Sequence, residues 1–364
     1  MLDSTAESHQ KMTELSRPDC KLVIGIDEAG YGPNLGPLVV AGSVWSVPNA
    51  LAEPQWNARL EPAFADSPWT AGSRHVPLGD SKRLYQRSQG LDTLEAGVVC
   101  LLSLAGVQPG AIQELAPRCI DWDWQAPHPP SQGGTHRRNR VGLPTECPPW
   151  YDMLWNARIP ESDSHLGALD ECVQLAGEVL KRHGMRLLGL HCVLVTEPDF
   201  NRKVERLDSK GQLLSETSLQ LAHRLMEQYY GSHTELAGCP IEVYFDRQGG
   251  RKNYSPLLMQ EFPDTWFATG ELRASRSSYH CRTRPWRFFF TVRGDCFPPV
   301  AAASMWAKYM RERAMQALNA FWRSHVTDLL PTAGYPRDAV RFEQRIAAVA
   351  ERLGIPRAWY WRCR

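Results

Sequence analysis

The chain has 364 residues, enough for one large domain or two ordinary ones, and it can bury a sizeable core without disulfide or metal staples. Hydrophobic residues make up 43% and charged residues 22%, a globular balance that excludes a disordered or fibrous protein. The formal net charge is only +1, so a nucleic-acid partner has to be argued from local sites and not from a basic field.

The cysteines and the N-terminal residues indicate the compartment. The ten cysteines include no C-x-x-C pair, which argues against a structural zinc site and favours reduced thiols in the cytoplasm. Residues 1–20 are polar without an apolar centre, so they are interpreted as a loose tail and not as a signal peptide. No run of 18 apolar residues occurs, so no membrane association is expected. Nothing in the sequence indicates a protein partner.

The first expected elements are two neighbouring strands at 21–27 and 37–47. Both are β-branched runs, and Gly and Pro residues separate them. A helical pattern follows within 78–106, where Asp80 or Ser81 is the candidate N-cap.

Residues 117–164 are rich in Pro and Gly and hold no period for more than a few positions. A loop of this length inside a compact domain is typical of a functional cover or a mobile insertion, and we predict an insertion. Beyond it, apolar spacing predicts a helix at 165–184, a strand at 187–198 and a helix at 213–230.

The last third of the chain predicts further strands and two helices. A strand begins at 241 and stops on Asp246, and one or two strands within 265–295 end on Asp295. Helices are expected at 301–325 and at about 338–353, with a turn between them. Strands mingle with helices throughout, so the fold class is α/β.

Three strand-like segments, "IGIDE", "VYFD" and "VRGD", end in acidic residues. If their ends meet at one edge of a sheet, then Asp27, Glu28, Asp246 and Asp295 form a cluster whose charge requires cations. An aspartate at a strand end is also common as a solvated turn residue, so only the joint placement of the four favours a site.

Oxygen-only clusters of this kind suit Mg²⁺ or Mn²⁺. Two such ions would activate a water and stabilise the leaving oxygen in the displacement of a phosphodiester. The four acids therefore indicate hydrolysis of a phosphodiester with two divalent ions.

Five motifs in order resemble the type 2 ribonucleases H, that is ribonuclease HII and its sister HIII. "GIDEAGYGPNLGPLVV" is similar to the family's "GIDEAGRGPLAGPVV", and "LGDSKRL" is similar to its "LDDSKKL". "VYFD", "VRGDCFPPVAAASMWAKYMRER" and "AGYPRD" match its later motifs. The resemblance implies a ribonuclease H-like mixed sheet flanked by helices in residues 21–330, followed by a C-terminal helical extension at 331–364.

The resemblance also implies the roles of individual residues. Asp27, Glu28, Asp246 and Asp295 stand where the family has its metal-binding and catalytic acids. The implied substrate-binding residues are those of the turn after the first acids, the lysine of the D-S-K motif and the tyrosine of the last turn: Gly30, Tyr31, Gly32, Lys82 and Tyr335.

The chain departs from the family at the turn, where Tyr31 replaces an arginine or lysine. Arg247 also stands where the family has glycine, and Arg337 where it has threonine. The choice of substrate is therefore less firmly implied than the cleavage chemistry, although Tyr31 suits stacking on a sugar or base.

Other features have both a functional and a plain interpretation. The arginines between 273 and 293 alternate with aromatic residues, which suits a strand that follows phosphates on one face or a charged, protected sheet edge. A second "DSK" at 208–210 is interpreted as a helix cap, and Lys308 with Glu312 as an ion pair on a helix. The basic run 136–140 is interpreted as solvated.

The sequence as a whole predicts an endonuclease that uses Mg²⁺ or Mn²⁺ to hydrolyse the RNA strand of RNA/DNA hybrids, or to cut at ribonucleotides embedded in DNA. Two alternatives stay open. One is a catalytically silent nucleic-acid-binding protein on the same fold, and the other is a nuclease of altered specificity.

Overall fold

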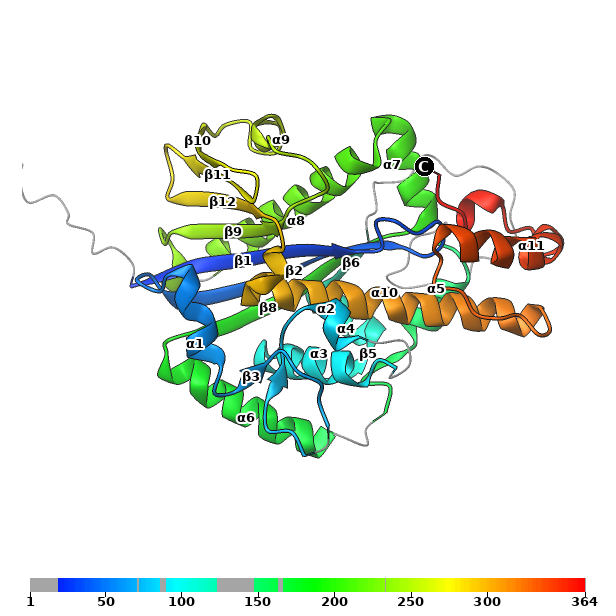
Figure 1. Ribbon diagram of the computed structural model, residues 1–364, viewed down its shortest axis with the longest axis horizontal. Helices are drawn as coiled ribbons and strands as arrows, with labels where there is room; N and C mark the ends of the chain where they lie inside the picture. The colour runs from blue at the N-terminus through cyan, green and yellow to red at the C-terminus, as the bar shows by residue number, and fades with distance from the viewer. Residues whose placement is uncertain are drawn as a thin grey trace, which may run out of the picture.

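A computed structural model describes residues 19–70, 72–85, 90–122, 147–162, 166–232 and 234–363. Most of the predicted N-terminal tail and the middle of the predicted insertion, including the basic run 136–140, lie outside these ranges. The described residues form one eight-stranded mixed sheet with helices on both faces, so the expected α/β class is confirmed (Figure 1).

The centre of the sheet contains the two strands expected first. β1 (Cys20–Ala29) pairs antiparallel with β2 (Leu38–Pro48) and parallel with β9 (Ile241–Asp246). Residues of β1 alternate between the two faces, since Val23 joins one hydrophobic core and Ile24 the other. This alternation is the period that a strand buried on both faces requires.

The full strand order is β10-β11-β12-β9-β1-β2-β8-β6. Beyond β2 lie β8 (Arg186–Val195), as predicted, and β6 (Ile120–Trp122). On the other side the range 265–295 contains three strands, where one or two were expected: β10 (Phe267–Leu272), β11 (Arg276–Cys281) and β12 (Trp286–Thr291). Short turns at 273–275 and 282–285 separate the three strands. These breaks were not predicted, because aromatic residues occur on both sides of each one.

Helix α10 (Pro298–His325) lies along one face of the sheet and is the predicted helix 301–325 extended by one turn (Figure 1). Its N-terminus touches β1, because a Cβ on Gly25 would lie 2.2 Å from the carbonyl carbon of Pro299. Only glycine permits this approach of helix to strand. The close packing brings the start of α10 beside the strand that carries the first two acids.

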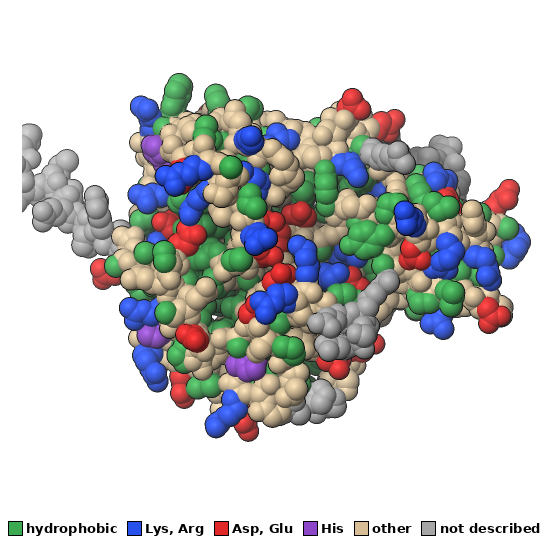
Figure 2. Space-filling model, in the orientation of Figure 1, with side chains coloured by type: hydrophobic (Ala, Val, Ile, Leu, Met, Phe, Trp, Pro, Cys, Tyr) green, Lys and Arg blue, Asp and Glu red, His purple; other side chains and the backbone are tan. Residues whose placement is uncertain are grey.

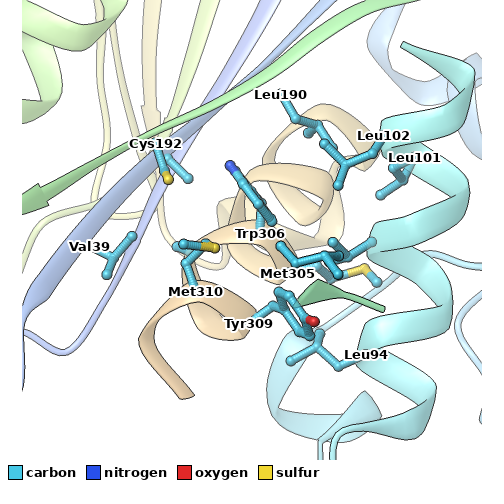
Figure 3. Close-up of a cluster of buried hydrophobic side chains, with 14 of the residues drawn as sticks. Val39, Leu94, Leu101, Leu102, Leu190, Cys192, Met305, Trp306, Tyr309 and Met310 are labelled. Atoms are coloured by element: carbon cyan, nitrogen blue, oxygen red, sulfur yellow. The ribbon is translucent and has the colours of Figure 1, made fainter. Parts of the chain in front are cut away.

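The core on the α10 face is built from large side chains. Figure 3 shows Trp306 and Met305 of α10 beside Leu101 and Leu102, and Trp306 is completely buried. The partner helix is α3 (Asp92–Leu104), with α6 (Leu166–Arg182) packed on it. Burial of each such side chain contributes about 1.5–3 kcal/mol, so this core holds α10 firmly on the sheet.

The opposite face carries α7 (Glu197–Leu207), α8 (Lys210–Ser232) and α9 (Ser255–Glu261). The predicted helix 213–230 is the central part of α8. α7 and α9 were not predicted, because each is short and begins with a proline in its first turn. Their apolar residues join the second core around β1, β9 and β12.

The single helix expected within 78–106 is wrong in extent. The structure has α2 (Ser81–Leu84) and, after a break, α3. Asp80 caps α2, since its carboxylate accepts a hydrogen bond of 2.8 Å from the backbone N–H of Lys82. The D-S-K motif therefore forms a separate one-turn helix, which places Lys82 independently of α3.

The range 117–164 includes regular structure at both ends. The end of α4 (Ile112–Cys119) and β6 lie in its first residues, and α5 (Trp150–Trp155) and β7 (Arg158–Ile159) lie in its last part. Trp150 is completely buried and packs against Trp322 of α10, with ring centroids 6.0 Å apart. Trp150, Tyr151 and Trp155 are buried and therefore belong to the core, which the loop interpretation of this range did not predict.

The remaining elements are short, apart from the last helix. α11 (Pro336–Arg352) matches the predicted C-terminal helix, and its buried face joins the core of α10. The others are η1 (Glu53–Gln55), α1 (Trp56–Leu60), β3 (Phe64–Ala65), β4 (Val76–Pro77), β5 (Gly110–Ala111), η3 (Thr234–Leu236), η4 (Gly294–Cys296) and η5 (Arg357–Trp359). Within the described ranges, every helix is too short or too polar to cross a membrane.

Candidate metal and nucleic-acid site

The sheet brings two of the four predicted acids directly together. β1 and β9 are parallel neighbours, and Ile26 is paired with Phe245, so Asp27 and Asp246 come next in the same register. Neighbouring strands lie about 4.8 Å apart, and residues in register point to the same face. Asp27 and Asp246 therefore stand side by side at the carboxyl edge of the sheet.

Asp295 reaches this edge from a different element than expected. It lies in η4, after β12 has ended, and not at the end of a strand. The backbone N–H of Gly294 donates a 2.7 Å hydrogen bond to Asp246 Oδ1. A Cβ on Gly294 would lie 3.0 Å from the Cα of Asp246, so this glycine allows the loop that carries Asp295 to approach β9.

The four carboxyl groups act on one another electrostatically. Burial raises the pKa of Asp27 well above its usual value, and the charges of Glu28 and Asp246 raise it further. Burial and the charge of Asp246 raise the pKa of Glu28 to about 7. Burial also raises the pKa of Asp246, with the charge of Asp295 as a further cause. The charge effects thus link Asp27, Glu28 and Asp246 to one another, and Asp295 to Asp246.

The pKa of Asp295 is raised as well, first by burial and then by the charge of Asp80. Lys82 opposes these shifts, because its ammonium lowers the pKa of Glu28, Asp246 and Asp295. α2 thus brings one cation to three of the acids. The substrate-binding role of Lys82 stays a prediction.

Helix α10 orients the first acid through a serine that sequence reasoning missed. Ser304 hydrogen-bonds the carboxyl group of Asp27, and its hydroxyl lies 2.9 Å from that of Ser81 in the D-S-K motif. The backbone N–H of Glu28 donates a second hydrogen bond to Asp27, at 2.8 Å. Asp27 is therefore fixed from its own strand and from α10.

The donor chemistry fits a hard divalent cation. The acids offer only oxygen ligands, and burial together with neighbouring carboxylates raises their pKa values. Among the described residues, no group of three or more His, Cys, Asp or Glu side chains is placed to hold a metal ion. Mg²⁺ is usually held by one or two carboxylates together with waters and substrate phosphates.

Two predicted substrate-binding segments meet beside the acids. The backbone N–H of Asn34, in the loop that follows Gly30, Tyr31 and Gly32, donates a 2.7 Å hydrogen bond to the carbonyl of Gly334. The next residue, Tyr335, is 53% exposed at the start of α11. The structure therefore joins the first glycine-rich turn to the last one, and it leaves the ring of Tyr335 open to solvent.

Two buried arginines support this pair of turns, and neither was predicted. Arg311 of α10 is 2% exposed, and its guanidinium donates a 2.9 Å hydrogen bond to the carbonyl of Ala333. Arg362 is completely buried and donates 2.7 and 3.0 Å hydrogen bonds to the carbonyls of Gly30 and Pro33. Sequence alone gives no signal for Arg362, because its partners are more than 300 residues away.

The predicted ion pair between Lys308 and Glu312 is confirmed at 2.7 Å. Glu312 also accepts hydrogen bonds of 3.0 Å from the hydroxyl of Tyr85 and 3.1 Å from Arg311. Burial raises the pKa of Glu312, but these neighbours lower it, with Lys308 having the largest effect among them. The pKa of Glu312 therefore lies below its usual value. Glu312 therefore connects α10 to the segment that carries Lys82.

Of the six arginines between 273 and 293, only Arg276 and Arg287 lie on strands, so the expected alternation along one strand is wrong. Exposed Arg287 stands between buried Trp286 and Phe288. Arg247 is bound into this segment, since it donates a 2.7 Å hydrogen bond to the hydroxyl of Ser277. Figure 2 shows acidic side chains near the middle of the face, with Lys and Arg side chains on both sides of them. A polyanion across this face would meet cations on each side of the acids.

Solved structures resemble the chain over most of its length. One is ribonuclease HII from Archaeoglobus fulgidus in a complex with PCNA, at 16% identity and a TM-score of 0.37, covering 94% of both chains. The ribonuclease H2 of Pyrococcus horikoshii gives 15% and 0.42, covering 93% of this chain and 92% of that one. Bst ribonuclease HIII in complex with Mn²⁺ gives 14% and 0.43, covering 99% and 70%.

The chain is similar to ribonucleases HII and HIII. The observed mixed sheet flanked by helices is the arrangement that the motifs implied. No family model and no curated protein matches the chain. Because the TM-scores lie below 0.5, the functional argument depends on the residues of the site.

Without metal, the protein is expected to lose stability as the pH rises. The folded state raises the pKa of Glu28 from 4.5 to about 7, so the unfolded chain releases this proton first. Stability from this group is then complete below about pH 4.5 and is lost by about pH 7, which corresponds to roughly 3 kcal/mol. Urea unfolding in EDTA at pH 5 and pH 8 measures the loss.

Glu28→Gln removes the titrating group, so this variant is expected to lose less stability between the two pH values than the wild type. Glu61→Gln, at an exposed position, is the matched control and should follow the wild type. Added Mg²⁺ at pH 8 should stabilise the wild type more than Glu28→Gln. Equal pH dependence in all three proteins would contradict the assigned pKa.

Proposed function

We propose that the protein is a divalent-metal-dependent endonuclease that hydrolyses the RNA strand of RNA/DNA hybrids or cuts at ribonucleotides embedded in DNA. The observation that carries the proposal is the placement of Asp27 and Asp246 side by side, with Glu28 and Asp295 in the same electrostatic environment. A structural role does not require repelling carboxyl groups to be gathered at one edge of a sheet.

Asp27, Glu28, Asp246 and Asp295 would hold the ions, with Mg²⁺ or Mn²⁺ as the cations that suit them. When bound, two such ions supply an activated water and stabilise the leaving oxygen of a phosphodiester. The elevated pKa values imply that the carboxyl groups release protons when cations bind, so cation affinity rises with pH.

The chain's own residues orient the acids. Ser304 and the N–H of Glu28 hold the carboxylate of Asp27, and the N–H of Gly294 holds that of Asp246. These bonds fix the rotamers of the two central acids before a substrate arrives, which is the preorganisation that catalysis requires.

Substrate contacts are proposed on both sides of the acids. Lys82 offers a positive charge to a phosphate beside the acids. The backbone of Gly30, Tyr31 and Gly32 lies along the turn that Arg362 supports, and the exposed ring of Tyr335 suits packing against a sugar. We also propose a cytoplasmic location, because cysteines scattered along the sequence without C-x-x-C spacing favour reduced thiols.

The test is cleavage of four labelled duplexes in Mn²⁺ or Mg²⁺: an RNA/DNA hybrid, a DNA duplex with one ribonucleotide, plain DNA and plain RNA. The proposal expects cleavage of the first or second only. Cleavage of plain DNA or RNA would favour a nuclease of altered specificity. Binding of the hybrid without cleavage, at any protein concentration, would establish the silent alternative.

A further inference from the structure

The turn after the first two acids lacks a cation in the sequence, yet the structure supplies one from another element. The ammonium of Lys210, the first residue of α8, lies 5.3 Å from the centre of the Tyr31 ring. Lys210 belongs to the second D-S-K segment, which the sequence had suggested only as a helix cap. Sequence reasoning therefore found the cap but missed the contact with the turn.

The capping role is real and fixes the position of Lys210. The hydroxyl of Ser209 accepts a 3.2 Å hydrogen bond from the backbone N–H of Gln212. Asp208 has a left-handed backbone with φ of 49°, which ends α7 and turns the chain into α8. The segment thus places the start of α8 at a defined point beside the turn.

The first turn of α8 lies beside Tyr31. A Cβ added to Gly211 would be at an ordinary contact distance, 3.7 Å, from the hydroxyl oxygen of Tyr31. Tyr31 is half-buried against the second core, which holds its ring in place. The pair is therefore a fixed arrangement in which a cation from α8 covers an aromatic side chain of the turn.

The arrangement is poorly explained by stability alone. Both side chains are half-exposed, and a cation–π contact of this kind is worth about 0.5–1 kcal/mol. Tyr31 follows Glu28 by three positions, so their Cα atoms lie within about 10 Å of each other. The contact between Lys210 and Tyr31 therefore belongs to the turn that directly follows the two acids at the end of β1.

We propose that Lys210 and Tyr31 together form a binding contact for the sugar-phosphate backbone of the nucleic acid, a few nucleotides from the scissile phosphate. The ammonium binds a phosphate as a point charge, and the ring of Tyr31 holds it and supports the adjacent sugar. This inference rests on the proposed function, because it assumes that a nucleic acid crosses the acids.

Equilibrium binding tests the contact separately from cleavage. A fluorescently labelled RNA/DNA hybrid is titrated in EDTA, and anisotropy is followed between about 50 and 200 mM salt. Lys210→Ala is expected to weaken binding about tenfold and to reduce the slope of log affinity against log salt by about 1. Lys210→Arg should retain both, and Tyr31→Phe should retain more affinity than Tyr31→Ala.

Lys181→Ala, at an exposed position in the last turn of α6, is the matched control. Thermal unfolding of each variant shows whether the fold is retained. If Lys210→Ala binds like the wild type, or if Lys181→Ala weakens binding equally, the assignment is overturned.

The cleavage assay of the wild type separates this failure from failure of the proposed function. Cleavage of the hybrid together with unchanged binding by Lys210→Ala rejects only the Lys210 contact. Specific loss of binding in that variant, in a protein that cuts none of the duplexes, supports the contact and rejects the nuclease. A wild type that neither binds nor cuts rejects both.

Discussion

Asp27→Asn is expected to lower the rate of hybrid cleavage about 10³-fold. The substitution keeps the size of the side chain but removes the charge at the residue that is fixed by Ser304 and the N–H of Glu28. Charge stabilisation by a bound cation is worth several kcal/mol, and each 1.4 kcal/mol is about tenfold in rate. Single-turnover cleavage with saturating protein measures the effect apart from substrate binding.

The same substitution should leave the fold intact and raise stability without metal, because it removes one of the repelling charges. Asp208→Asn is the matched control, since Asp208 is exposed and asparagine accepts its left-handed backbone. It should cleave like the wild type. A wild-type rate in Asp27→Asn would show that the carboxylate at the end of β1 takes no part in the reaction.

Local patterns predicted the parts of the fold that depend on local chemistry. β1 and β2 were predicted because they are runs of β-branched residues that Gly and Pro residues separate, and α10 was predicted from its own local sequence. The approach of Asp27 to Asp246 followed from the assumption that strands ending in acids share one sheet edge. The parallel register of β1 with β9 brings the acidic ends of both strands to the same edge of the sheet.

Long-range packing decided what the sequence did not predict. Trp150 lies in a segment rich in proline, and only its contact with Trp322 shows that it belongs to the core. Asp295 lies in a 3₁₀ turn that the close approach of Gly294 to β9 permits, so its expected place at a strand end was wrong. The functional roles of the site residues stay predictions.

Arg362→Ala is expected to destabilise the protein by about 3–5 kcal/mol, the usual cost of removing one partner from a buried charged cluster. Its guanidinium packs 4.4 Å from the ring of Phe200 and donates hydrogen bonds to the carbonyls of Gly30 and Pro33. Glu197 is also completely buried and interacts with this charge. Without the arginine, two carbonyls and an acid are left buried with one cation fewer.

Urea unfolding measures this loss, and Arg357→Ala is the control. Arg357 lies in the same C-terminal segment and forms an ion pair with Glu343. The Arg357 side chain is 59% exposed, so loss of this ion pair should lower stability by less than about 1 kcal/mol. Arg362→Lys retains the charge but not the planar fork that reaches both carbonyls, so it should fall between the two. Equal stability of Arg362→Ala and Arg357→Ala would mean that the turn carrying Tyr31 keeps its shape without the buried guanidinium.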